Sequence, residues 1–385
     1  MRFNALGRAG LALVAAMLSC SVACAADPIT SKGFGTTADG AEVQQFTLVN
    51  AKGSTLKAIE YGASITNLLV ADKAGKMGDI VLGYDTLREY ELSVPSMGNV
   101  VGRYANRIAG GTFMIPGEGG GAGTRYYLAQ NNGVNTLHGG FKGIGKRTWK
   151  GDAGMTGEGP TVRFTLLDPD GAEGFPGNVK FTVIYTLTND DTLKIQFFAT
   201  TDKATPINLS QHAYYNLSGD GKGEVLPYIV KAAANKYLPV DAGLVPTGKI
   251  DPVAGTPFDF TKPKTIGQDI KPLPGIPPGY DHTLVLDSGN GTLAKAIEVY
   301  DPASGRAVEC WTTEPAVHFS CARNLSNLPG KNGATYQPYA GFVLETQHFS
   351  DSPNKPDFPS TILRPGQTYH QLTVYKFTNP GKAPE

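Results

Sequence analysis

The sequence predicts an all-β fold, a large antiparallel β-sandwich. Short apolar runs alternate with turn residues along the chain, and Gly and Pro are abundant, at 48 and 27 of 385 residues. No segment has the pattern of a long amphipathic helix, and strands do not alternate with helices as they do in βαβ proteins. The alternation is clearest in residues 179–187 and 193–200, which a turn at 189–191 joins into a hairpin.

In chain order, the predicted strands begin with a hairpin. Residues 45–49 and 56–61 flank a turn, residues 63–70 form the next strand, and residues 79–84 form a short strand that enters a loop. The further predicted strands are residues 162–167, 179–187, 193–200, 208–217, 296–300, 306–311, 316–321, 341–348, 363–370 and 372–377. The glycine-rich run 117–123 is predicted to be a loop, because no strand-to-helix context would make it a nucleotide-binding loop.

The first 25 residues have the features of a cleaved signal peptide. A basic start with Arg2 and Arg8 precedes an apolar run at 11–18, and small residues follow at 23–25. The apolar run is too short to span a bilayer. We therefore expect residues 1–25 to be removed and residues 26–385 to form the mature domain, which would be periplasmic or secreted. The alternatives are a buried N-terminal helix, or lipid attachment at Cys20 or Cys24, whose preceding residues fit that pattern poorly.

Charge and cysteine content limit the partners. The 34 basic and 34 acidic residues balance, so nothing indicates a nucleic-acid or polyanion partner.

Cys310 and Cys321 stay in the mature chain of 385 − 25 = 360 residues. They predict either one disulfide or two free buried thiols, and they lack the CxxC spacing of a metal site. This length suits one large β domain or two smaller ones.

One predicted strand contains a histidine where a core strand would have Val or Ile. If residues 208–217 are a strand, Ser210, His212 and Tyr214 point to the same face. Far downstream, Glu345 follows an apolar run near the end of its own predicted strand. We predict that His212 and Glu345 face each other across a pocket as an acid–base pair.

Four further residues are candidates for binding polar ligands. The guanidinium of Arg107 and the amide of Asn106 suit neighbouring hydroxyl groups. His138 precedes two glycines, which allow the backbone to approach a ligand closely, and the carboxylate of Asp281 can accept two hydrogen bonds. Each residue also has a purely structural interpretation: a turn with solvated arginines, a histidine in a glycine turn, or an aspartate capping a turn.

Five motifs in order resemble those of the aldose 1-epimerase (galactose mutarotase) family. They are residues 102–108 (GRYANRI), 135–140 (NTLHGG), 212–217 (HAYYNL), 313–317 (TEPAV) and 344–347 (LETQ). Residues 363–366 (LRPG) and 375–377 (YKF) resemble the closing strands of the family. The resemblance covers roughly residues 33–378.

The resemblance implies a single-domain β-supersandwich with its site in a groove. It places the general acid at His212 and the general base at Glu345. The family often has a sugar-contacting glutamine where this chain has His318, so His318 bears on substrate preference. The implied substrate-binding residues are Asn106, Arg107, His138, Tyr214, Asp281 and His318.

The implied reaction interconverts the α and β anomers of an aldose, with a monosaccharide as partner and no cofactor. We expect a monomer or a weak homodimer without a membrane span. One alternative is a glycoside hydrolase that uses Asp281 and Glu345 as its two carboxylates. The others are a non-catalytic periplasmic sugar-binding protein and a metal site of His138, His212 and His318, whose sequence separations give no ligand spacing.

Overall fold

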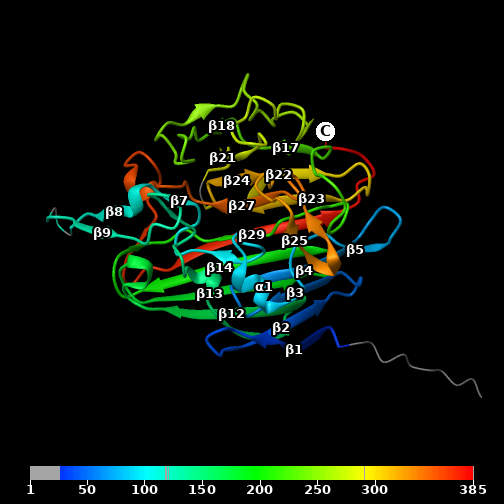
Figure 1. The fold of residues 1–385 in the computed structure, drawn as a ribbon, viewed down its shortest axis with the longest axis horizontal. Coiled ribbons are helices and arrows are strands. Elements are labelled where there is room, and N and C mark those ends of the chain that lie inside the picture. Colours follow the sequence, from blue (N-terminus) through cyan, green and yellow to red (C-terminus); the bar gives the residue numbers. More distant parts are fainter. Residues whose placement is uncertain (1–26, 118, 120, 290, 385) are drawn as a thin grey trace, which may run out of the picture.

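The computed structural model describes residues 27–117, 119, 121–289 and 291–384, and strands dominate these residues (Figure 1). The predicted signal peptide lies outside the described residues, as do two positions of the glycine-rich run, 118 and 120. Within the described part of the chain, no helix combines the length and the apolar character that crossing a bilayer requires. The all-β fold class is confirmed.

The described strands form three principal antiparallel sheets. The first has the order β1-β2-β3-β4-β5, from Ile29–Thr36, Glu42–Val49, Thr55–Ile59, Ser64–Ala71 and Met77–Asp79. The second has the order β11-β12-β13-β14-β29-β23-β22-β17-β20, from Lys150–Met155, Pro160–Asp168, Val179–Leu187, Thr192–Thr201, Tyr369–Thr378, Ala307–Thr312, Ala294–Tyr300, Ile229–Ala232 and Lys264–Thr265. The third has the order β19-β18-β21-β24-β27, from Asp251–Pro252, Lys236–Tyr237, Asp281–Val285, Ala316–Ser320 and Val343–Gln347.

Short paired strands and single-turn helices connect these sheets. The pairs are β6 (Val100–Val101) with β16 (Ser210–Gln211), β7 (Arg107–Ile108) with β10 (Thr136–Leu137), β8 (Thr112–Ile115) with β9 (Thr124–Tyr127), β15 (Thr205–Pro206) with β28 (Ile362–Leu363), and β25 (Leu328–Pro329) with β26 (Thr335–Tyr336). Among the residues that the structure describes, the α-helix is α1 (Leu87–Leu92), and the 3-10 helices are η1 (Ala109–Gly111), η3 (Ile144–Lys146), η4 (Ala172–Gly174), η5 (Lys331–Gly333) and η6 (Ser352–Asn354).

The main core lies between the second sheet and the other two sheets. In β13, Val179, Phe181 and Val183 are fully buried, whereas Lys180, between the first two, is exposed, which is the alternation that the sequence predicts. Across the interface the ring of Phe46 in β2 meets Phe164 in β12 edge to face, with centroids 5.8 Å apart. Figure 1 shows the blue strands β1–β4 beside the green strands β12–β14, with β29 running across the middle of the molecule.

Most predicted strands are present, but two segments differ. The predicted strand 79–84 is wrong, because β5 ends at Asp79. The segment after it forms backbone hydrogen bonds with residues 214–216 instead: Leu82 donates to the carbonyl of Tyr214, and the carbonyl of Ile80 accepts the N–H of Asn216. The predicted strand 208–217 shrinks to β16, Ser210–Gln211. Asn208 and Tyr215 make single bridges to three different segments, so the backbone of this stretch bonds with several partners in turn.

Three smaller differences concern local chemistry. The helix α1 was not predicted; it begins with a capping box between Thr86 and Glu89. The predicted strand 363–370 splits into β28 and β29, with a turn between them. Cys310 in β23 and Cys321 after β24 are both free and buried, because they belong to different sheets, so the disulfide alternative is wrong.

Candidate active site

One pocket of about 420 Å³ brings together all eight residues that the sequence singled out. The volume falls in the range of about 300–1,000 Å³ that is usual for small-molecule sites. The eight come from segments far apart in the chain: Asn106, Arg107, His138, His212, Tyr214, Asp281, His318 and Glu345. The fold therefore assembles the predicted set in one place.

The register of the third sheet places three of these residues side by side. His318 in β24 lies opposite Thr283 in β21 and opposite Glu345 in β27. Asp281 is two residues before Thr283, so its side chain points to the same face. Glu345 is the middle residue of its strand rather than near the end, as the sequence had suggested. One face of the sheet thus presents two carboxylates and an imidazole to the pocket.

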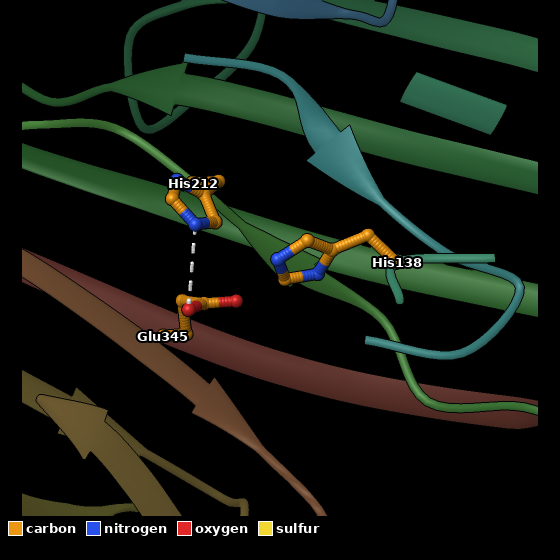
Figure 2. A group of neighbouring side chains, drawn as sticks. All are labelled: His138, His212 and Glu345. Carbon is orange, nitrogen blue, oxygen red and sulfur yellow. Dashed lines mark ion pairs between the residues drawn. The ribbon is translucent and has the colours of Figure 1, made fainter. Parts of the chain in front are cut away.

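His212 and Glu345 face each other, as Figure 2 shows. Nε2 of His212 lies 3.6 Å from Oε1 of Glu345, which is beyond hydrogen-bond length. Glu345 is only 2% exposed. Within the described part of the chain, Oε2 of Glu345 and Nδ1 of His212 are buried and have no hydrogen-bond partner. Because an unpaired buried polar atom is costly, this pair is suited to a ligand whose hydroxyl groups supply the missing bonds.

The backbone holds His212 in place on both sides. Its N–H donates to the carbonyl of Asn99 at 2.9 Å, and its carbonyl accepts the N–H of Gly98 at 3.0 Å. The ring of Tyr214 lies 5.1 Å from that of His212, measured between centroids. Tyr214 lines the pocket, while Ala213 and Tyr215 belong to the hydrophobic core. The alternation of faces predicted for His212, Ala213, Tyr214 and Tyr215 therefore holds, although this part of the chain is not a strand.

His138 is the third side chain of this group, and its ring points toward His212 and Glu345 (Figure 2). The backbone N–H of Asn106 donates to its Nδ1 at 3.1 Å, so the proton of the neutral ring is on Nε2. Burial, with the charges of His212 and Arg107, holds the pKa of His138 well below its ordinary value. His138 therefore offers a neutral Nε2–H donor to the pocket near pH 7.

The two glycines after His138 serve a different purpose from the one predicted. A Cβ on Gly139, which has a φ of +84°, would lie 2.0 Å from the carbonyl oxygen of Gly102. A Cβ on Gly140 would lie 2.2 Å from the carboxylate of Glu173. The close approach is therefore to other parts of the protein rather than to a ligand, and it fixes the turn that carries His138.

Arg107 and Asn106 form a rigid unit at the pocket wall. Oδ1 of Asn106 accepts the backbone N–H of Arg107 at 2.9 Å and its Nη1 at 3.3 Å. Nε of Arg107 donates to Oδ1 of Asn132 at 3.2 Å. Both residues are buried, so the interpretation of solvated arginines in a turn is wrong for Arg107. It is also wrong for Arg103, which is 1% exposed and pairs with Asp168 away from the pocket.

The carboxyl group of Asp281 is ionised at neutral pH. Burial alone would raise its pKa, but the hydrogen bond from His318 and the charge of Arg107 outweigh burial and hold the pKa of Asp281 well below its usual range. Nε2 of His318 and Oδ1 of Asp281 are 2.8 Å apart. A carboxylate that stays ionised is a hydrogen-bond acceptor for a ligand and a poor proton donor.

The sequence did not indicate all of the pocket wall. Asn132 lies in the segment 131–140, where only His138 was singled out. Two loops add further wall residues, which are Val94, Pro95, Ser96, Asn324, Leu325 and Ser326. These loop residues carry no pattern that would have identified them, because their only common property is position.

His138, His212 and Glu345 also form the one group of potential metal ligands within the described residues, with ligand atoms within 4.8 Å of one another. A metal would need the lone pair of His138 Nε2, and Nδ1 would then carry a proton that faces the N–H of Asn106. Metal-bound histidines instead donate their other N–H to an acceptor. The alternative set with His318 fits no better, since both ring nitrogens of His318 bond to protein groups.

Comparison with known proteins identifies the family. The family model described as aldose 1-epimerase matches residues 44–376. The chain belongs to the aldose 1-epimerase family. It is thus an isomerase that acts on carbohydrates, and its reaction is the interconversion of aldose anomers.

The matches between this chain and its relatives in the aldose 1-epimerase family cover most of the chain. The galactose mutarotase of Homo sapiens is 40% identical over 321 residues, which are 83% of this chain and 90% of the relative. The aldose 1-epimerase of Escherichia coli (strain K12) is 33% identical over 350 residues, which are 88% of this chain and 96% of the relative. The crystal structure of an aldose epimerase homologue from C. elegans has 31% sequence identity and a TM-score of 0.78, and the match covers 91% of this chain and 99% of that one.

Proposed function

We propose that this aldose 1-epimerase opens and closes the sugar ring with His212 as general acid and Glu345 as general base. The observation that carries the assignment is the facing pair of His212 and Glu345 in one pocket, 3.6 Å apart and not hydrogen-bonded to each other. Two relatives are named for galactose or for aldoses in general, and we propose hexoses of the glucose and galactose type as substrates.

In the proposed reaction, the imidazolium of His212 gives its proton to the ring oxygen while Glu345 takes the proton of the C1 hydroxyl. The bond from C1 to the ring oxygen breaks, and the C1 carbonyl forms. Rotation about the C1–C2 bond then presents the other face, and the ring closes with the two roles exchanged. His138 Nε2–H and Arg107 stabilise negative charge on the ring oxygen. Protons and electrons balance over the cycle, so no cofactor is required.

Glycoside hydrolysis by Asp281 and Glu345 is a weaker alternative. Such an enzyme needs one carboxylic acid with a raised pKa to protonate the leaving oxygen. The pKa of Asp281 moves in the opposite direction, because His318 and Arg107 stabilise its charged form. Release of phenol from an aryl glycoside would revive this alternative, whereas mutarotation changes only the optical rotation.

Polarimetry of freshly dissolved α-glucose and α-galactose tests the proposal. The enzyme should speed the approach to equilibrium above the buffer rate, with a bell-shaped dependence of kcat on pH. Glu345→Ala and His212→Asn should each lower kcat by roughly 10²–10⁴-fold, the range of general acid–base catalysis. Near-normal rates in either variant would contradict the assignment. A wild-type protein that never exceeds the buffer rate would instead indicate a non-catalytic sugar-binding site. Xylose and arabinose complete the panel and rank substrate preference.

We also propose that the mature enzyme is exported. The basic start, the apolar run and the small residues before position 26 support cleavage after Ala25. N-terminal sequencing of the protein from a periplasmic extract should begin at Ala26, and a chain that retains Met1 would contradict export with cleavage.

We expect a monomer or a weak homodimer, which light scattering at several protein concentrations would distinguish from a stable oligomer.

A further inference from the structure

The ring of His318 connects three polar groups of the pocket. Nε2 of His318 lies 2.8 Å from Oδ1 of Asp281. Nδ1 lies 3.3 Å from Nδ2 of Asn106 and 3.1 Å from Oγ1 of Thr283. His318 is 5% exposed. Both nitrogens of the ring therefore bond to protein groups, and neither is left to bind a sugar.

These contacts determine which nitrogen carries the proton. Oδ1 of Asn106 is engaged by the N–H and the guanidinium of Arg107, so the amide turns its NH₂ group toward His318. An NH₂ group only donates, which makes Nδ1 of His318 an acceptor. The proton of the neutral ring is then on Nε2, where it meets the carboxylate of Asp281, which only accepts. The contact with Asn106 and the contact with Asp281 therefore both require the tautomer that carries its proton on Nε2.

We propose that neutral His318 is a positioning residue that fixes Asn106 and Asp281 for recognition of two neighbouring sugar hydroxyls. The proposal rests on the function proposed above and deepens it. His318 uses one oxygen of Asp281 and one Nδ2 hydrogen of Asn106. That leaves Oδ2 of Asp281 as an acceptor and the second Nδ2 hydrogen of Asn106 as a donor, and both residues line the same pocket. An acceptor next to a donor matches a pair of vicinal hydroxyls, each of which can donate and accept.

The tautomer is tested directly by NMR, without any sugar. In protein labelled with ¹⁵N-histidine, long-range proton–nitrogen correlation distinguishes a protonated from an unprotonated ring nitrogen. The signal that disappears in His318→Gln identifies His318. At pH 7 it should show a proton on Nε2 and none on Nδ1. A proton on Nδ1 would overturn the proposal, whether the ring is charged or in the other neutral tautomer.

Kinetics separate positioning from catalysis. His318→Phe keeps a ring but loses both bonds, so the KM for glucose and galactose should rise roughly tenfold or more, as expected for a lost hydrogen bond to a charged group. The kcat should change much less. His318→Gln retains one acceptor and one donor on its amide and should restore most of the affinity. An unchanged KM in His318→Phe, or equal losses in the Phe and Gln variants, would overturn the proposal.

The control is His370→Phe, which alters an exposed histidine in β29 that stacks on Phe198 and should leave KM unchanged. Monodeoxyglucoses add a second test: the wild-type enzyme should discriminate against those lacking either contacted hydroxyl, and His318→Phe should lose this discrimination. If His318→Phe does not fold, the tautomer and the His318→Gln kinetics decide. If the wild-type enzyme never exceeds the buffer rate, the proposed function fails, while the NMR result still decides the tautomer of His318.

Discussion

At the scale of single residues, hydrogen-bond partners separate the three histidines of the pocket. Nδ1 of His138 accepts the Asn106 N–H, and both nitrogens of His318 are engaged. His212 differs, since its Nδ1 has no partner among the described residues and its Nε2 faces Glu345. A histidine that gives and takes a proton needs a nitrogen free to meet the substrate, which His318 lacks, and the lowered pKa of His138 keeps that ring neutral. His212 is therefore the best placed of the three to act as acid.

The role proposed for His138 can be tested by removing its donor. His138→Phe keeps the ring that packs edge to face against His212, with centroids 5.2 Å apart in the parent protein. Because the Nε2–H is lost, kcat should fall roughly 10²-fold, as for removal of one positioned donor to a developing oxyanion. His138→Gln, which can offer an N–H, should lose less. A His138→Phe enzyme with normal kcat would show that the ring serves only packing.

At the scale of the elements, a buried ion pair anchors the loop that carries Asn106 and Arg107. Nε of Arg103 lies 2.6 Å from the carboxylate of Asp168 at the end of β12. Its other nitrogens donate to the carbonyls of Pro169 and Pro176 at 2.7 and 2.9 Å. Without Arg103, the buried carboxylate of Asp168 keeps only the partly exposed Arg147, whose Nη1 lies 2.9 Å away. Breaking one side of a buried pair in this way costs more than the pair itself contributes.

Arg103→Met should therefore destabilise the protein by about 3–5 kcal/mol. The matched control is Arg163→Met. Arg163 lies in β12, like Asp168, and its exposed pair with Asp152 of the neighbouring strand β11 should contribute less than about 1 kcal/mol. Urea unfolding monitored by circular dichroism gives both values. Equal losses in the two variants would show that Arg103 contributes no more than a surface charge does.

At the scale of the whole molecule, buried histidines couple stability to pH. Burial lowers the pKa of His282 to about 4, against the attraction of Asp281, and the pKa of His138 is also depressed. The unfolded chain binds these protons at about pH 6.5, so their contribution to stability is complete above that pH and is lost as the pH falls. His348 acts in the opposite sense, because Glu314 raises its pKa despite burial.

The free energy of unfolding should therefore fall as the pH is lowered from 6.5 toward 4, since two depressed groups outweigh one raised group. Urea midpoints at pH 7, 6 and 5 measure this slope. His282→Gln removes one of the two depressed groups and should flatten the slope. A midpoint that does not change with pH, or an identical slope in His282→Gln, would contradict this account.

The fold class and many strands could be predicted from sequence because alternation is a local property. The prediction for residues 179–187 agrees with β13 in both bounds. Local pattern failed for residues 208–217, whose backbone partners are Tyr104, Val81, Val100, Val101 and Phe342. No single neighbour holds that segment, so its extended shape does not make it a strand. The same limit applies to Cys310 and Cys321, for which the sequence left a disulfide open. Cys310 lies in β23 and Cys321 directly follows β24, two strands of separate sheets, and both thiols are free.

For the pocket, the ordered motifs of the sequence named His212 and Glu345, and the carboxylate alone made Asp281 a candidate, because residue type already limits the chemistry a position can perform. The protonation and orientation of those side chains depended on contacts made in the folded chain. Nδ1 of His138 accepts a hydrogen bond from a backbone N–H that is 32 positions earlier in the chain. His318 bonds to Asn106, 212 positions away, and to Asp281, 37 positions away. A hydrogen bond is set by distance in space, so the proton positions follow from how the sheets bring these segments together.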